Sequence, residues 1–134
     1  MAAPAVRCLD DAVIETEPKI VIAAAQMLNM LLAFLIELAM LGAFGFSAYA
    51  AVAGGWKGWL GALVIMALVV VIWAIWGAPR SSHRLAGLAL LAFKLVLFGM
   101  AALALAAVDQ TGLALAFAVL AGVNLGLAQV WGQA

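Results

Sequence analysis

The chain has 134 residues, of which 70% are hydrophobic and 9% are charged, and its formal net charge at pH 7 is +0. A soluble domain is about half apolar and about a quarter charged, so this chain, with a mean hydropathy of +1.28, has too little polar surface for a water-exposed fold. The composition indicates an integral membrane protein, with the lipid bilayer as its surroundings, and offers no basic patch for nucleic acid.

The first 19 residues are polar and precede the apolar part of the chain. They contain four carboxylates and two prolines but no apolar stretch long enough for the core of a secretory signal peptide. We therefore expect 1–19 to be a mobile cytoplasmic tail, followed by a single domain over 20–134. Cys8 is the only cysteine, which excludes an internal disulfide and a multi-cysteine metal site.

Four apolar segments follow, each at least about as long as the ~20 residues that cross a bilayer as a helix. Gly54–Gly55, the polar loop Gly77–Arg84 and the turn Asp109–Gly112 separate them. The sequence therefore predicts an all-α integral membrane four-helix bundle. Because the connections are short, consecutive helices are expected to be antiparallel neighbours. The predicted spans are about 28–52, 57–76, 85–108 and 113–131.

The basic residues predict the orientation of these helices. Four of them fall on one side of the predicted membrane, and Lys57 falls on the other; the four are Arg7, Lys19, Arg80 and Arg84. Loops rich in lysine and arginine remain in the cytoplasm, so both termini are expected there.

Glu37 is a carboxylate in the middle of an apolar run, and Lys94 occupies a similar place in the third segment. An unpaired charge at the bilayer centre costs several kcal/mol, about 3 on insertion scales. Because both helices start from the same side, the two charges lie at similar depths and can form a direct or water-bridged buried pair. Alternatively, each charge reaches its own interface or another polar partner.

Three amides accompany these charges: Asn29 in the first helix, and Asn124 and Gln129 in the fourth. Such groups find hydrogen-bonding partners across helices, so Asn124 is interpreted either as interhelical packing or as part of a binding site. We predict a binding site formed by Asn29, Glu37, Lys94 and Asn124. If they recognise a ligand, these four side chains should converge on one solvent-reachable cavity.

The fourth helix also carries small residues at four-residue spacing, among them Ala118, Gly122 and Gly126. Small residues at this spacing allow helix backbones to approach closely. The pattern predicts helix packing on this face and, with it, a homo-oligomer or a place in a larger membrane complex.

Several chemistries are absent from the sequence. His83 is the only histidine and lies in a loop, so we expect neither a metal nor a haem held by two histidines of one chain, and no other cofactor. No nucleophile–base motif, phosphate-binding loop or dinucleotide fingerprint occurs, so we do not expect an enzyme.

Four segments resemble one family in their order along the chain. Asn29 to Ala39 resembles the N-x4-F-x2-EL-A signature of the YrdB-like small membrane proteins, and Trp73 to Arg80 resembles their W-x4-AP-[KR] stretch. Lys94 to Gly99 is similar to their K-x3-FG pattern. Thr111–Gly112 and Asn124–Leu125 match near the C-terminus.

This resemblance extends from about Ala24 to Gln133 and implies a multi-pass protein of the bacterial inner membrane, with no assigned activity, substrate or cofactor. Residues 1–19 look like an extension beyond the family core.

Two hypotheses about function follow from the residues. The first is binding or transport of a small molecule or ion through a buried Glu37/Lys94 site in an oligomer. The second is a structural or accessory subunit that docks onto a larger membrane complex. An enzyme ranks last because catalytic groups are lacking.

Overall fold

The computed structural model describes the backbone of residues 4–133 and the side chains of residues 18–133. The described chain folds into four helices, and no strand occurs within it. All four are long and apolar enough to cross a membrane. Their bounds are α1 Pro4–Ala51, α2 Gly55–Trp76, α3 Gly87–Ala107 and α4 Thr111–Val130. The last three lie within a few residues of the predicted ranges.

Helix α1 differs from the prediction at its N-terminal end. It begins at Pro4 rather than near residue 28, so the backbone of residues 4–19 is helical where a tail was expected. Residues 1–3 of that predicted tail lie outside the described residues. Pro18 removes one backbone hydrogen bond inside the helix, and the helical residues on both sides continue through it. The apolar part of α1 alone has 34 residues, about 51 Å of helix, against a hydrocarbon core of about 30 Å.

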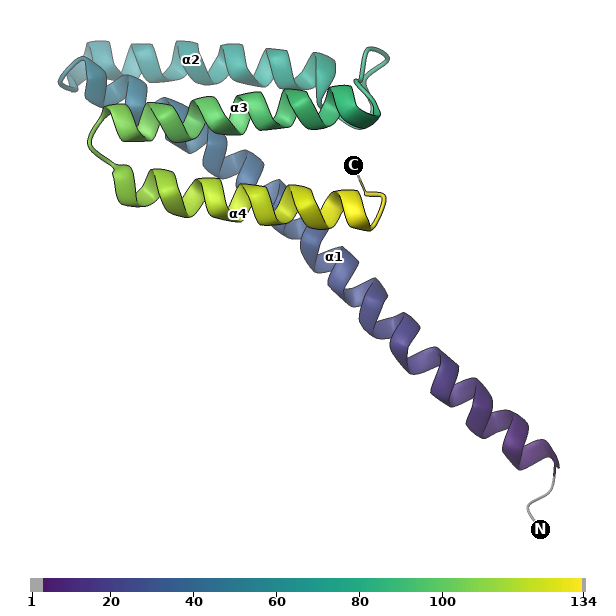
Figure 1. Ribbon diagram of the computed structural model, residues 1–134. Coiled ribbons are helices and arrows are strands. Elements are labelled where there is room, and N and C mark those ends of the chain that lie inside the picture. The colour runs from purple at the N-terminus through teal and green to yellow at the C-terminus, as the bar shows by residue number, and fades with distance from the viewer. Residues whose placement is uncertain (1–3, 134) are drawn as a thin grey trace.

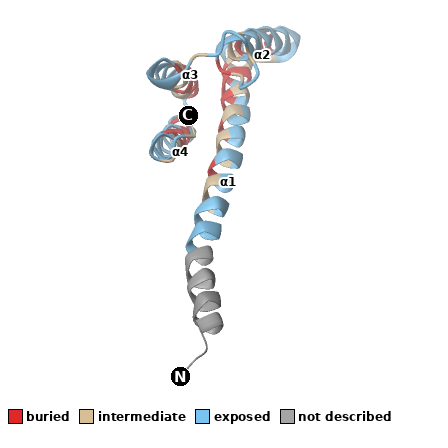
Figure 2. Ribbon diagram, turned by 90° about the vertical axis from the view of Figure 1, so that its right-hand side faces the viewer, coloured by how far each residue is buried: buried red, intermediate tan, exposed pale blue. Residues whose placement is uncertain are grey.

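The four helices do not form a closed bundle of sequential neighbours. In the view of Figure 1, α2, α3 and α4 run roughly parallel, while α1 crosses them obliquely and extends well beyond them. Figure 2 shows α2 on one side of α1, with α3 and α4 on the other. Helix α1 packs against all three partners and α3 packs on α4, whereas α2 packs chiefly on α1. The expected α2–α3 pairing is therefore wrong over most of their length. The two helices meet through Trp76 and Phe93, whose ring centroids are 6.2 Å apart.

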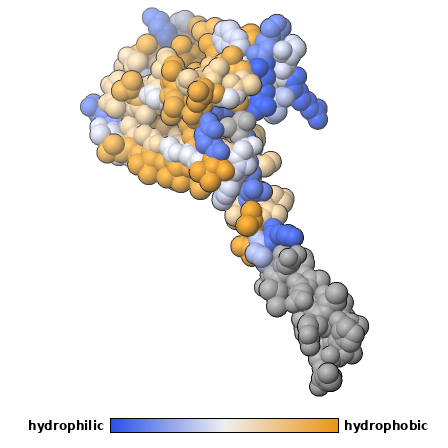
Figure 3. Space-filling model, turned by 45° about the vertical axis from the view of Figure 1, so that its right-hand side comes forward, coloured by the Kyte–Doolittle hydropathy of each residue, from blue (hydrophilic) through white to orange (hydrophobic). Residues whose placement is uncertain are grey.

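The core forms where α1 meets α3 and α4. Met40, Leu90 and Ala101 are almost fully enclosed there, and the rings of Phe98 and Phe117 meet edge-on at 5.9 Å. The outward faces remain apolar and exposed, as Figure 3 shows over much of the lateral surface. Lipid chains can cover such faces without a hydrophobic penalty, so this surface fits a membrane-embedded protein.

A tight turn and small residues hold α2 against α1. Ala53, Gly54 and Gly55 follow one another in the left-handed backbone region, with φ of 55°, 76° and 72°. A Cβ added to Gly58 would lie 2.8 Å from the Tyr49 ring and 3.1 Å from its backbone oxygen. The two helices therefore approach closely only because this position carries no side chain.

Candidate functional site

Glu37 of α1 and Lys94 of α3 form an ion pair within the membrane-spanning helices. Lys94 Nζ lies 3.4 Å from Glu37 Oε1, so the predicted pairing is confirmed. This distance is longer than the 2.7–2.9 Å of a strong charge-assisted hydrogen bond. The two charges attract one another without forming a strong charge-assisted hydrogen bond.

The predicted burial of this pair is wrong. The side chains of Lys94 and Glu37 are 20% and 18% exposed, and none of the charged side chains described in residues 18–133 is buried. The fold explains this exposure. Because α1 separates α2 from α3 over most of their length, α2 does not cover the pair formed by α1 and α3. The charges lie at the border of the core rather than inside it.

Two buried asparagines connect α1 to α4. Asn124 Nδ2 donates hydrogen bonds to the backbone oxygen and to Oδ1 of Asn29, both at 2.9 Å. Asn29 Nδ2 in turn donates to Gln133 Oε1 at 3.0 Å. The two residues are only 5% and 2% exposed, so their amides depend on these partners.

The hydrogen bonds across helices that the sequence predicted for Gln129 are made by Gln133. Gln129 is exposed on α4, whereas Gln133 contacts Asn29 and also donates from Nε2 to the backbone oxygen of Gln26 at 3.2 Å. The way in which α4 ends explains why Gln133 rather than Gln129 makes these contacts. The amides of Gly132 and Gln133 bond back to the oxygens of Gln129 and Ala128, and Gly132 has φ 64°. This glycine-dependent end folds the chain back over the bundle, and a glycine directly after the predicted helix was the available signal.

Three of the four predicted site residues line one small cavity. Asn29, Lys94 and Asn124, together with Gln133, border a space of about 40 Å³ between α1, α3 and α4. The expectation of a single cavity for all four is not met, because Glu37 lines a different one.

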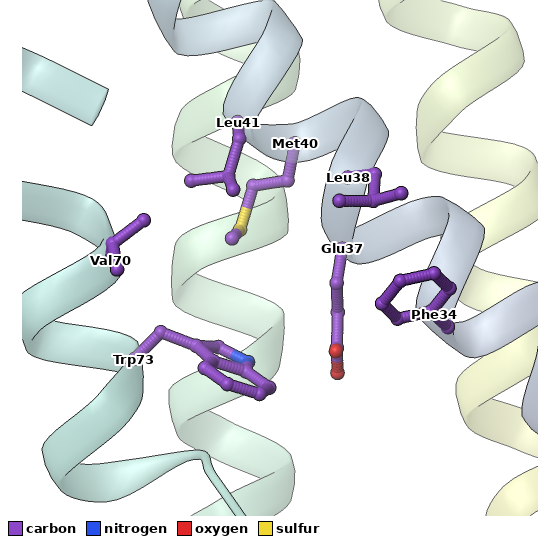
Figure 4. Close-up of a pocket in the computed structure, with 7 residues that line it drawn as sticks. All are labelled: Phe34, Glu37, Leu38, Met40, Leu41, Val70 and Trp73. Atoms are coloured by element: carbon purple, nitrogen blue, oxygen red, sulfur yellow. The ribbon is translucent and has the colours of Figure 1, made fainter. Parts of the chain in front are cut away.

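The second cavity lies between α1 and α2 and measures about 100 Å³. Figure 4 shows the side chains that line it, with Glu37 and Phe34 coming from α1 and Trp73 from α2. Its walls are apolar side chains and the stem of Glu37. The indole N–H of Trp73 is a buried donor with no acceptor among the described residues, a feature that the sequence did not single out. The ion pair thus lies between a cavity lined partly by amides, which Lys94 borders, and an apolar cavity, which Glu37 borders.

The described residues do not support the two other kinds of site considered, a metal site and a catalytic serine–histidine pair. Among the side chains of residues 18–133, no group of three or more metal-ligating residues comes together. Ser82 Oγ and His83 Nδ1 are 3.1 Å apart, but they are adjacent residues in an exposed loop. This contact is local to the loop and lies outside both cavities.

The small-residue stripe of α4 faces away from the rest of the chain. Ala118, Gly122 and Gly126 are exposed, and a Cβ added to either glycine would meet nothing within 4 Å. Among the residues whose side chains are described, 18–133, no other helix packs against these three positions. The inward face of α4 consists instead of Ala114, Phe117, Ala121, Asn124 and Leu125.

Comparison with known proteins gives one family. Residues 31–122 match the model of a family described as a protein of unknown function, DUF2568. No curated protein and no solved structure matches the chain significantly. The matched range contains Glu37 and Lys94, whereas Asn29, Asn124 and Gln133 lie outside it. Since this range covers more than half of the sequence and all four apolar helices contribute to it, the chain belongs to the DUF2568 family.

Proposed function

We propose that this small membrane protein binds a small molecule or ion at the Glu37–Lys94 pair and moves it across the bilayer. The observation that supports the proposal is the position of the pair, partly exposed and between two cavities, within helices apolar enough to span a membrane. Charges in such helices are costly and commonly mark pathways for ions and substrates.

The geometry supports exchange of partners at this pair. At 3.4 Å and about one-fifth exposed, neither charge is sealed by the other. A ligand with a positive group can compete for Glu37, and one with a negative group can compete for Lys94. The apolar cavity beside Glu37 offers room for a small hydrophobic part of such a ligand.

Flux through liposomes tests this function. Purified protein would be reconstituted and screened with organic cations, organic anions and protons, and compared with Glu37→Gln. We expect the variant to fold but to lose the flux, because the amide keeps the shape and removes the charge. Asp109→Asn is the matched control, since it makes the same chemical change in an exposed turn. Equal flux in all three proteins would contradict the proposal.

An accessory subunit is the second candidate, and the packing of α2 favours it. This helix packs chiefly on α1, and Leu60, Leu63 and Leu68 lie exposed on it. We expect a larger complex to be recovered in mild detergent, to be lost on Leu63→Trp and to survive Glu37→Gln. That pattern, together with no flux in any protein, would replace the transport proposal.

We also propose that the protein resides in a bacterial inner membrane. The support is the resemblance of four ordered segments to the YrdB-like small membrane proteins. Fractionation of the membranes of a bacterium that produces the protein would test the location.

A further inference from the structure

A series of hydrogen-bonded amides leads from beyond the end of α4 to the cavity that Lys94 lines. It begins at Gln133, which bonds to Gln26 and Asn29, and continues through the Asn29–Asn124 hydrogen bonds. Below these amides lies the cavity of about 40 Å³, with Lys94 in its wall. The series therefore runs from the end of α4 into the membrane-spanning part of the protein.

The size and walls of this cavity fit water. A cavity holds a water molecule when it offers about 10–15 Å³ and two to four polar partners. This one is larger than that, and four of its ten lining residues are polar, namely Asn29, Asn124, Gln133 and Lys94, while the other six are apolar. Water there would hydrate the Lys94 ammonium and reduce the penalty of holding a charge among apolar helices.

Gln133 occupies the outer end of the cavity. Two hydrogen bonds of 3.0 and 3.2 Å hold its side chain, and the turn at Gly132 places it there. The turn at Gly132 fixes the backbone of Gln133, so release of its side chain requires only these two side-chain hydrogen bonds to break. Gln133 therefore covers the outer end of the cavity.

We infer that the cavity among Asn29, Lys94, Asn124 and Gln133 is a water-filled inlet from the side of the membrane where the chain ends, and that Gln133 closes it. This inference concerns access to Lys94 from water. It stands independently of whether the protein transports anything, because hydration of the site needs no net movement of a ligand.

Silver ion is a suitable probe because it is small, reacts with thiols and does not enter hydrocarbon readily. In a Cys8→Ser background, Ala33→Cys places a thiol in the cavity wall, and Val96→Cys places one on the exposed face of α3. Protein in liposomes would be exposed to Ag⁺, quenched and denatured, and the remaining free thiols counted by alkylation and mass spectrometry. We expect Ag⁺ to block the cavity thiol much faster than the lipid-facing thiol.

Removal of the cover should accelerate this reaction. Gln133→Ala loses two hydrogen bonds, and we expect about a tenfold faster block of Ala33→Cys, equivalent to about 1.4 kcal/mol in favour of the open state. Gln129→Ala changes an exposed amide of the same helix and should leave the rate unchanged. Ala128→Cys, also in the cavity wall, replaces Ala33→Cys if that variant does not fold.

Two results would overturn the inference. Equal rates at the cavity thiol and at Val96→Cys would mean that the cavity is dry. An unchanged rate in Gln133→Ala would mean that Gln133 does not close it. Neither readout depends on flux, so a failure here is distinct from a failure of the transport proposal.

Discussion

Glu37 and Lys94 illustrate how single residues depend on one another in this protein. Each would be an uncompensated charge among apolar helices if the other were removed, and each is only partly exposed. The same dependence holds for Asn29 and Asn124, whose buried amides are partners across α1 and α4. At both places, removal of one member leaves the other without its partner, which generally costs more than the pair itself contributes.

The charges should therefore be thermodynamically coupled. We expect Glu37→Gln and Lys94→Met each to destabilise the protein more than the double substitution does, with a coupling energy of about 1–3 kcal/mol. Unfolding in detergent, monitored by circular dichroism, measures the three variants against the natural chain. Strictly additive effects would show that the 3.4 Å contact has no energetic consequence.

The amides offer a second test with a matched control on the same helix. Asn124→Ala removes two hydrogen bonds to Asn29 and should cost about 1–2 kcal/mol, near the upper end of values for interhelical hydrogen bonds in membranes. Gln129→Ala, at an exposed position, should cost almost nothing. Unfolding in detergent measures the stability of both variants. A similar loss of stability from the two substitutions would argue against the Asn29–Asn124 contact.

At the scale of helices, the packing of α1 determines the shape of the molecule. Small residues allow α2 to lie directly on its C-terminal part, while α3 and α4 pack on the other side. The tight approach of α1 and α2 keeps α2 away from most of α3, and this separation leaves the Glu37–Lys94 pair partly exposed.

Glycine substitutions should separate close packing from open surface. Gly58→Ala should destabilise the protein, because the new Cβ would lie 2.8 Å from Tyr49 Cδ2 and 3.1 Å from the Tyr49 backbone oxygen. Gly99→Ala meets nothing within 4 Å and should be neutral or stabilising by up to about 1 kcal/mol through helix propensity. Thermal unfolding of the two variants side by side checks this, and equal effects would contradict the close α1–α2 contact.

At the scale of the whole molecule, the arrangement of charge should fix its orientation. The α2–α3 loop and the end of α4 lie at one end of the helices, and the α1–α2 turn lies at the other (Figure 1). Basic residues Arg80 and Arg84 belong to the first end and Lys57 to the second. The positive-inside tendency then favours one orientation, with the chain end and the inlet toward the cytoplasm.

Labelling of intact cells tests this topology. In a Cys8→Ser background, Val52→Cys should react with a membrane-impermeant maleimide from outside, whereas Ser82→Cys should react only after the cells are opened. Both positions are exposed, so accessibility in the folded protein does not bias the comparison. External labelling of Ser82→Cys in intact cells would reverse the orientation.

The outward stripe of α4 predicts self-association. Because Ala118, Gly122 and Gly126 pack against no other helix among the residues whose side chains are described, we propose that a second copy covers them. Native mass spectrometry in mild detergent should show a dimer or larger species, and Gly122→Leu should shift the distribution toward monomer. Gly99→Leu, at an exposed position of α3, is the matched control, and a monomeric natural chain would refute the proposal.

The sequence by itself determined the class of fold and the identity of the charged pair. Apolar run lengths predict four spanning helices, because bilayer thickness sets how many residues a helix needs. The cost of an isolated charge in hydrocarbon predicts that Glu37 and Lys94 meet. Both are consequences of local composition and solvent, and they require no knowledge of how the helices pack.

Only the tertiary structure decided which helices touch and which polar groups share a cavity. The sequential pattern predicted α2 beside both α1 and α3; α2 packs on α1, with Gly58 close to Tyr49, but it lies apart from most of α3. This arrangement leaves the ion pair partly exposed and separates Glu37 from the cavity of Lys94. Gln133 entered the polar cluster through a backbone turn at Gly132. Such outcomes depend on the steric fit of surfaces from distant segments, which hydropathy along the chain does not encode.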